Sequence, residues 1–243
     1  MGSGYVDLHC HYVPGIDDGV RNEEESLALL KGLRLIGYTE VVATPHMRPG
    51  MFDNTKEKIE SAFEGIAIKL EGEEIPRLSL GAEHFFDEVF LERLERKDVL
   101  PYRGKSSILI ELHYEVWPQN FEVLLFRLQL KGLQPVIAHP ERYRALFRRS
   151  DLLASALNRG AVALLDLMSL VGRYGESCQR AAERMLEEGL YDAACSDAHR
   201  PSDVEHVARG IERLRILVGR EAAERLLGEN PRRIAQGNYE RDE

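Results

Sequence analysis

The sequence has few cysteines, no excess of positive charge and no long apolar run, and each of these absences excludes a class of protein. Its three cysteines, Cys10, Cys178 and Cys195, are odd in number and widely spaced, so no disulfide framework is predicted. The formal net charge of −9 argues against broad nucleic-acid binding and leaves room only for a local basic pocket. No apolar run is long enough to cross a bilayer and no signal peptide is visible, so we expect a cytoplasmic protein without membrane insertion.

The length and composition are those of a globular protein. Of the 243 residues, 44% are hydrophobic and 30% are charged, and a chain of this length can bury a sizeable core. We find no repeat, low-complexity stretch or interdomain linker, so we predict a single domain over residues 1–243. Residues 1–4 read Met-Gly-Ser-Gly, which resembles the remnant of an expression tag, and they receive no interpretation.

Short apolar runs alternate with helical patterns along the chain. Asn22 is a candidate N-cap for a helix that continues to about Ile36, and further helices are expected near residues 55–71 and 203–218. Near-continuous apolar runs between helices predict a parallel sheet covered by helices, and seven strands suit a closed or nearly closed α/β barrel. The predicted strands cover residues 5–9, 40–44, 77–80, 107–111, 134–138, 161–165 and 191–195.

Residues that can bind metals follow most of these predicted strands. Six of the seven strands end in such a residue, and the strand at 161–165 is the exception unless Asp166 serves. Alternate residues of a strand share a face, so His9 and His11 point the same way, and Asp197 and His199 repeat that spacing. Because chemistry gathers at the carboxyl ends of barrel strands, we expect these side chains to share one pocket. The other candidates at strand ends are His46, Glu83, Glu111 and His139.

Taken singly, each of these residues is a weak signal, because short motifs often match by chance. An isolated H-x-H pair is commonly two partly exposed histidines. The whole set is more specific, since five of the eight histidines occupy these positions and Glu83 and Glu111 would otherwise bury a charge at a cost. We interpret His84 and His206 as ordinary residues, whereas His113 is close enough to Glu111 in sequence to line the pocket.

The acidic segment Asp17-Asp18-Gly19 is either an ordinary turn or the source of one more metal-binding carboxylate. Because the ligand set contains imidazoles and carboxylates but no thiolates, a closed structural zinc site is disfavoured. The same ligands suit manganese, iron or zinc, and ligand type alone does not separate these metals.

The segment from Cys178 to Arg184 matches the C-x5-R spacing of cysteine-dependent tyrosine phosphatases. That chemistry needs a glycine-rich loop whose backbone N–H groups surround the phosphate, whereas the residues between Cys178 and Arg184 are strong helix formers. Six residues along a helix turn by about 240° net, so the two side chains would not converge. We therefore predict a buried cysteine and a solvated arginine on one helix.

Seven short motifs occur in a fixed order along the chain. They are Asp7-Leu8-His9-Cys10-His11, Asp17-Asp18-Gly19 with Glu24-Glu25-Ser26, His46 to Phe52, Gly81-Ala82-Glu83, Ile137 to Arg142, Ser196 to His199, and Glu229-Asn230-Pro231. In this order they resemble the PHP (polymerase and histidinol phosphatase) superfamily. The resemblance is closest to the bacterial manganese-dependent protein-tyrosine phosphatases encoded with capsule and exopolysaccharide genes, and it spans essentially the whole chain.

This resemblance implies a fold and a metal centre. The fold would be a distorted (β/α)7 barrel of the PHP type with three divalent metal ions at the C-terminal strand ends, manganese being favoured over iron or zinc. The implied ligands are His9, His11, Glu83 and Asp197 for one metal, Glu83, Glu111 and His139 for a second, and Asp18, His46 and His199 for the third.

The resemblance also implies a hydrolase that acts on phosphotyrosine. A metal-bridging hydroxide would attack phosphorus in line with the departing phenol. Arg142, with Arg48 and Arg200 as further candidates, would bind the phosphate oxygens through a planar guanidinium group. The implied substrate is a phosphotyrosine protein, namely a bacterial tyrosine kinase that regulates polysaccharide synthesis and export.

Three other functions compete with this interpretation. A histidinol-phosphate phosphatase of the same superfamily is the nearest, although Asp18 and the stretch from Arg48 to Phe52 favour the tyrosine phosphatase. A DNA-processing phosphoesterase is disfavoured because the chain is acidic and lacks a basic stripe. A non-catalytic metal-binding partner of a kinase is disfavoured by the complete ligand set, since structural sites rarely leave several metals open to water.

Overall fold

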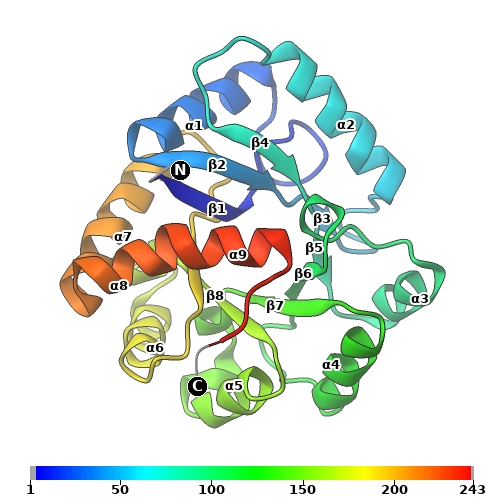
Figure 1. Ribbon diagram of the computed structural model, residues 1–243, viewed down its shortest axis with the longest axis vertical. Helices are drawn as coiled ribbons and strands as arrows, with labels where there is room; N and C mark the ends of the chain where they lie inside the picture. The colour runs from blue at the N-terminus through cyan, green and yellow to red at the C-terminus, as the bar shows by residue number, and fades with distance from the viewer. Residues whose placement is uncertain (1–3, 242–243) are drawn as a thin grey trace.

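Parallel strands in two sheets form the centre of the molecule (Figure 1). The computed structural model describes residues 4–241. Residues 1–3 of the segment that resembles a tag remnant lie outside the described residues. One sheet has the order β1 (Tyr5–Cys10), β2 (Tyr38–Ala43) and β4 (Arg77–Leu80). The other has the order β3 (His46–Met47), β5 (Glu83–Phe85), β6 (Ser107–Glu111), β7 (Gln134–Ala138), β8 (Val162–Asp166) and β9 (Ala193–Cys195).

Two of the predicted strands continue after a break, and the continuation carries a site residue in each case. β2 stops before Thr44 and Pro45, and the chain resumes pairing as β3, which begins with His46; proline lacks the N–H that the ladder needs. β4 stops before Gly81, and β5 then begins with Glu83. A Cβ at Gly81 would lie 2.8 Å from the Tyr102 ring, so only glycine fits this break. His46 and Glu83 therefore begin short strands, whereas the sequence placed them just past the ends of the preceding strands.

Backbone hydrogen bonds also link the first strand to the end of the last. The amide of Asp197 donates to His9 O at 2.9 Å, and the amide of His11 donates to Ala198 O at 2.9 Å. With this link, the strands follow one another in chain order around the centre. All the strand pairs of the two sheets are parallel, which confirms the predicted α/β class.

Helices cover the outer side of the strands (Figure 1). The predicted helices are confirmed as α1 (Glu23–Leu35), α2 (Lys56–Lys69) and α7 (Asp203–Val218), and Asn22 caps α1 by accepting from the Glu25 amide at 2.9 Å. Short α helices α3 (Glu88–Arg96), α4 (Phe121–Leu130) and α5 (Ser150–Leu157) were not predicted, and α6 (Glu176–Glu187) is the helix expected around Cys178. Single-turn 3₁₀ segments are η1 (Tyr102–Gly104), η2 (Pro140–Arg142), η3 (Arg144–Phe147) and η4 (Leu167–Val171).

The carboxyl-terminal helices close the amino end of the strands. Figure 1 shows α8 (Arg220–Glu224) and α9 (Asn230–Gln236), joined by the π-helical η5 (Arg225–Glu229), crossing in front of the strands. Ile234 and Ala235 pack against a buried apolar cluster formed by alternate strand residues, including Leu8, Leu109 and Leu164. The opposite, carboxyl end of the strands is therefore the one that remains for a site.

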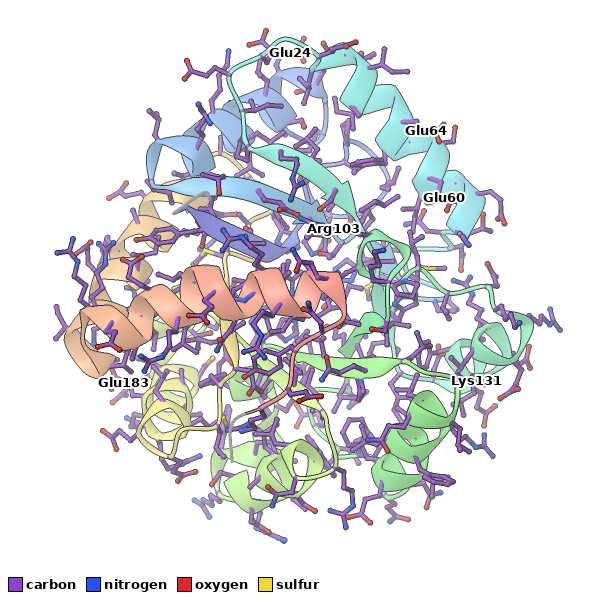
Figure 2. All side chains as sticks on the ribbon, viewed as in Figure 1. Glu24, Glu60, Glu64, Arg103, Lys131 and Glu183 are labelled. Carbon is purple, nitrogen blue, oxygen red and sulfur yellow. The ribbon has the colours of Figure 1, made fainter. Side chains whose placement is uncertain are left out.

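Charged side chains cover the helical exterior. Figure 2 shows Glu60 and Glu64 projecting outward from α2, away from the strands. Within the part of the chain that the structure describes, no helix has both the length and the apolar character that a membrane crossing requires.

Candidate metal centre

Ligand-type side chains from six strand ends and one loop meet at the carboxyl end of the strands. Within residues 4–241 they form four overlapping groups, and in each group one ligand atom per residue lies within 4.8 Å of the others. The groups are His11, Asp18, His46 and His199; His9, His11 and Glu83; His9, His139 and Asp197; and His46, Glu83 and Glu111. All nine residues predicted as metal ligands are thus brought together.

Glu83 lies at the centre of this arrangement. Its Oε2 atom is 3.2 Å from His9 Nε2 and 2.9 Å from His46 Nδ1, and its Oε1 atom is 3.2 Å from His139 Nε2. Asp197 Oδ1 is 3.2 Å from the same His9 nitrogen. Both carboxylates are buried. Donor atoms from strands far apart in sequence therefore point into one small volume.

Asp18 completes the outer side of the centre. Its Oδ1 atom lies 3.4 Å from His46 Nε2 and 3.5 Å from His199 Nε2. The Asp18 side chain is 55% exposed, whereas the other candidate ligands are largely buried. The Asp18 carboxylate therefore lies beside two of the candidate histidines, where the second interpretation of Asp17-Asp18-Gly19 would place it.

Hydrogen bonds at the outer ring nitrogens orient two of the histidines. Asp17 Oδ2 lies 2.8 Å from His11 Nδ1, and the carbonyl of Asp197 lies 2.8 Å from His199 Nδ1. An acceptor at Nδ1 holds the proton there, so the lone pair of Nε2 faces the centre. Asp17 was not predicted as a site residue; its only signal was its place beside Asp18.

Three carboxylate oxygens in the centre are buried without a well-formed hydrogen bond, although imidazole nitrogens or the Arg48 guanidinium lie near each of them. Among the described residues, no hydrogen bond reaches Glu83 Oε2, Glu111 Oε2 or Asp197 Oδ1. Burial, and then the neighbouring Glu83 carboxylate, raises the pKa of Glu111 to about 7. Burial also lowers the pKa of His139 to about 4, with Arg142 as the next cause, so this imidazole is neutral, the form that binds metals. This donor set fits divalent cations.

The backbone at two candidate ligands is held in the left-handed region. His139 has φ 32° and Asp197 has φ 46°, a conformation that costs energy for residues other than glycine. Each residue ends a strand and turns its side chain toward the centre, and strained conformations of this kind gather at functional sites.

The buried carboxylate of Asp7 joins the two segments that supply four of the nine candidate ligands. It accepts from the amide of Ser196 at 3.0 Å, from the Ser196 hydroxyl, and from the amide of His9 at 3.3 Å. It thereby fixes the end of β1 against the segment that leads to Asp197. This role of Asp7 was not predicted, although its place as the first residue of the D-x-H-x-H motif was a signal.

The three predicted arginines occupy different places. Arg142 donates to Asp166 and Asp197 and stacks on the Tyr174 ring, 3.7 Å from its centroid. Arg200 is exposed at the start of the segment before α7. Arg48 lies 3.5 Å from Glu111 and over the Phe85 ring. Arg142 and Arg48 thus each contact a candidate ligand, Arg142 through Asp197 and Arg48 through Glu111.

Next to the metal centre lies a cavity of about 470 Å³, named the inner cavity below. Asp18 and His199 border it on the side of the ligand groups. Three arginines, Arg142, Arg173 and Arg200, line it together with Met168, Tyr174 and Asp203, and Arg173 lies 3.7 Å from the Asp203 carboxylate. Arg173 was not predicted, because nothing in the irregular segment after β8 marks it. The acidic chain therefore has the local basic pocket that its net charge left room for.

Asp166 does not belong to the four ligand groups of the described residues. Its carboxylate instead binds Arg142 and accepts from the Met168 amide at 2.8 Å. The end of β8, the exception among the predicted strands, thus supplies an acceptor for an arginine. Its position in the site depends on tertiary contacts that no motif records.

Three histidines of the described residues, His84, His113 and His206, lie outside the ligand groups. This agrees with the prediction for His84 and His206, whereas His113 could have lined the pocket. His84 Nδ1 faces the Leu109 carbonyl at 3.1 Å and its Nε2 accepts from the Leu100 amide at 3.1 Å, so both nitrogens have structural partners. His206 lies on α7, and the exposed His113 accepts from the Glu115 amide.

Cys178 and Arg184 lie on α6, as predicted. The Cys178 thiol is buried, and burial, followed by the nearby Glu141, raises its pKa to about 12. Arg184 donates to the Leu146 carbonyl at 3.0 Å. The C-x5-R spacing therefore does not form a phosphate loop.

Comparisons with known proteins identify the family of this chain. Residues 5–236 match the family described as "Capsular polysaccharide synthesis, CpsB/CapC". The tyrosine-protein phosphatase YwqE of Bacillus subtilis is 32% identical over 196 residues, which cover 80% of this chain and 77% of the relative. The tyrosine-protein phosphatase CpsB of Streptococcus pneumoniae is 29% identical over 238 residues, covering 94% and 97%.

Solved structures agree as well. A structure from work on Bacillus subtilis YwqE and Streptococcus pneumoniae CpsB, described as unique metal-dependent tyrosine phosphatases, matches with a TM-score of 0.88 and 29% identity over 96% of this chain and 95% of that one. A phosphotriesterase homology protein from Escherichia coli matches with a TM-score of 0.58 and 13% identity, covering 96% and 99%, which concerns the fold alone. The chain belongs to the CpsB/CapC family of capsular polysaccharide synthesis.

Proposed function

We propose that this protein, a metal-dependent tyrosine-protein phosphatase by its family, hydrolyses phosphotyrosine with the nine-residue centre described above. One observation carries the proposal: three buried carboxylate oxygens without hydrogen bonds face the same cluster of imidazoles, beside a cavity lined by arginines. Buried charges need a counter-charge, and a phosphate monoester needs both cations and guanidinium groups to neutralise it.

Three divalent cations are part of this proposal, with manganese favoured and iron or zinc as alternatives. The proposed ligand sets are His9, His11, Glu83 and Asp197; Glu83, Glu111 and His139; and Asp18, His46 and His199. Bound cations of this kind activate water at neutral pH and neutralise the phosphoryl oxygens. The orientation of His11 and His199 through Nδ1 supports their assignment.

The arginines of the inner cavity would bind the phosphate oxygens. Arg142 is held from one side by Asp166 and Asp197, and its buried Nε–H has no hydrogen-bond partner among the described residues. Arg200 lines the same cavity and would close around the phosphate from the other side. Arg48 would act mainly through Glu111, which it contacts. Because the free pKa of tyrosine is near 10, its phenolate leaves readily and we assign no general acid.

The physiological substrate we propose is a phosphotyrosine-bearing tyrosine kinase that regulates polysaccharide synthesis or export, met in the cytoplasm. Family membership in capsular polysaccharide synthesis supports this part of the proposal. The names of the relatives, which describe them as tyrosine-protein phosphatases, support the phosphotyrosine specificity.

The test compares substrates on one metal-stripped preparation. Chelated protein reloaded with manganese should release phosphate from a phosphotyrosyl peptide and from p-nitrophenyl phosphate, and renewed chelation should abolish both activities. Faster turnover of histidinol phosphate than of the peptide would instead indicate the histidinol-phosphate phosphatase. No turnover with manganese, iron or zinc would indicate a non-catalytic metal-binding partner.

A further inference from the structure

A second cavity, of about 700 Å³, adjoins the inner cavity and is named the outer cavity below. The two share Arg142 and Tyr174, whose stacked side chains form the wall between them. The Tyr174 ring is 39% exposed. A ligand bound beside the metals can therefore continue past Tyr174 into the outer cavity without crossing a folded element.

The walls of the outer cavity come from segments that follow three successive strands. Tyr114 and Glu115 follow β6, Arg144 and Phe147 belong to η3 after β7, and Ser177 begins α6 after β8. The amide of Arg144 donates to the carbonyl of Tyr114 at 2.8 Å, which ties the first two segments together. Segments at carboxyl strand ends are the usual source of substrate contacts in α/β barrels.

The chemistry of this lining is aromatic and close to neutral. Tyr114 presents a ring that is 39% exposed, equal to that of Tyr174, and Phe147 is partly buried. The charges at the rim compensate each other, because Arg144 Nη1 lies 3.0 Å from Glu115 Oε1. Exposed aromatic rings around a concave surface favour apolar and aromatic ligands, whereas the arginine-lined inner cavity favours an anion.

We propose that the outer cavity is a specificity subsite that binds an apolar or aromatic side chain flanking the phosphotyrosine of a peptide substrate. The proposal rests on the proposed function, since it assumes that the phosphate lies in the inner cavity. The phosphotyrosyl group would fill the inner cavity, and the chain would pass Tyr174 so that a neighbouring residue packs among Tyr114, Phe147 and Tyr174. A free small phosphate ester would leave the outer cavity unused.

The test uses non-hydrolysable peptides, so that binding is read without turnover. Each peptide carries phosphonomethyl-phenylalanine in place of phosphotyrosine and either phenylalanine or glycine on both sides of it. Calorimetry on the manganese-loaded wild-type protein should give a Kd roughly tenfold lower for the phenylalanine-flanked peptide, the discrimination expected of one well-filled apolar pocket.

Variants locate this preference in the outer cavity. Ser177→Trp fills the cavity from the start of α6 and should remove most of the preference. Ser61→Trp, on the exposed face of α2, is the matched control and should keep it. Phe147→Ala removes part of the wall instead of filling the space, and it should also weaken the preference.

The outcomes separate this proposal from the function on which it rests. Equal Kd values for the two peptides on the wild-type protein, or a full preference retained in Ser177→Trp, would overturn the subsite. Hydrolysis of p-nitrophenyl phosphate by the wild-type protein is measured in parallel and reports on the proposed function alone. A protein that binds the phenylalanine-flanked peptide preferentially but hydrolyses nothing would keep the subsite and refute the phosphatase.

Discussion

At the scale of single residues, Glu83 organises the candidate metal centre. Its two oxygens lie close to three histidines from three different strand ends, and its side chain is buried. Asp197 has a comparable set of neighbours, but one of them is Arg142, whereas the neighbours given for Glu83 are all imidazoles. Removing its charge should therefore disturb the whole centre while leaving the apolar core in place.

Glu83→Gln keeps the side-chain shape and removes the negative charge. We expect its activity toward a phosphotyrosyl peptide to fall by more than about 100-fold. Loss of a group that only hydrogen-bonds to a metal ligand typically costs about 10–100-fold in activity, and loss of a ligand shared between two metals should cost more. Metal content after dialysis should fall together with the activity. Glu64→Gln, on the outer face of α2 (Figure 2), is the control and should match the wild type. Equal activity of the two variants would remove Glu83 from the centre.

His84 should make the stability of the protein depend on pH. The pKa of His84 is lowered to about 4 in the folded protein, chiefly by burial. In the unfolded chain this pKa is about 6.5. As the pH falls from about 6.5 to about 4, the unfolded chain binds a proton at His84 that the folded chain does not. This proton favours unfolding, so His84 stabilises the fold fully above about pH 6.5 and loses that contribution toward pH 4.

Urea unfolding across this pH range measures the effect. The wild type should lose about 3 kcal/mol more unfolding free energy between pH 6.5 and pH 4 than His84→Gln does. All other titrating groups are common to the two proteins and cancel in the difference. Parallel pH profiles for the two proteins would show that His84 is not held neutral.

Cys178 should be dispensable for catalysis. Its thiol is buried, and the raised pKa of about 12 keeps it protonated at neutral pH, so it is a poor nucleophile. Cys178→Ser should hydrolyse p-nitrophenyl phosphate at the wild-type rate, and iodoacetamide should leave the native protein active. A variant that kept its metals and lost all activity would restore the cysteine-dependent mechanism.

At the scale of elements, the close packing of α7 on η4 positions the segment that carries His199. A Cβ at Gly210 of α7 would lie 2.4 Å from the Leu167 carbonyl oxygen of η4. At the start of the same helix, Asp203 accepts from the amides of His199 and Arg200, each at 3.0 Å. Helix α7 thus packs on η4 through Gly210 and holds the segment of His199 through Asp203.

Two helical glycines test this packing against intrinsic helix preference. Gly210→Ala should lower the unfolding free energy by about 1–3 kcal/mol, since the new methyl group overlaps backbone atoms. Gly65→Ala on α2, where a Cβ would meet nothing within 4 Å, should raise it by about 0.5–1 kcal/mol through helix propensity alone. Chemical denaturation measures both, and a stabilised Gly210→Ala would contradict the described contact.

The elements also show what a sequence can and cannot predict. β4, β6 and β7 have their predicted bounds, β6 and β7 because each contains a continuous apolar run, and α1 follows from its Asn22 cap. β1, β2, β8 and β9 differ from their predicted bounds by one or two residues at one or both ends. α3 was missed although Asp87 caps it by accepting from the Phe90 amide at 2.7 Å, so that signal was present. α4 and α5 have no side-chain cap, and their starts depend on packing that only the folded chain provides.

The same division applies to the site. Most of the candidate ligands were predictable because they follow the predicted apolar strands, and the carboxyl ends of parallel strands meet. Asp18, which lies in a loop, was predictable only from the resemblance. The pairing of Arg142 with Asp166, and the place of Tyr174 over Arg142, were not predictable. Both depend on how the irregular segment after β8 folds back, and no local pattern encodes that path.

At the scale of the whole molecule, the two ends of the strands have different tasks. α9 and apolar strand residues fill the amino end, whereas charged and polar groups gather at the carboxyl end. The chain carries a formal net charge of −9, whereas three arginines line the inner cavity, so the proposed phosphate site is a local exception to the overall negative charge. This separation of stability from chemistry is usual in α/β barrels.

Anomalous diffraction from manganese-loaded crystals, recorded above and below the manganese absorption edge, tests the central claim most directly. We predict edge-dependent peaks enclosed by His9, Glu83 and Asp197, with further peaks beside Glu111 and His139 and between Asp18 and His199. Peaks confined to other parts of the molecule would contradict the metal centre. The absence of peaks from crystals soaked in saturating manganese would contradict it as well.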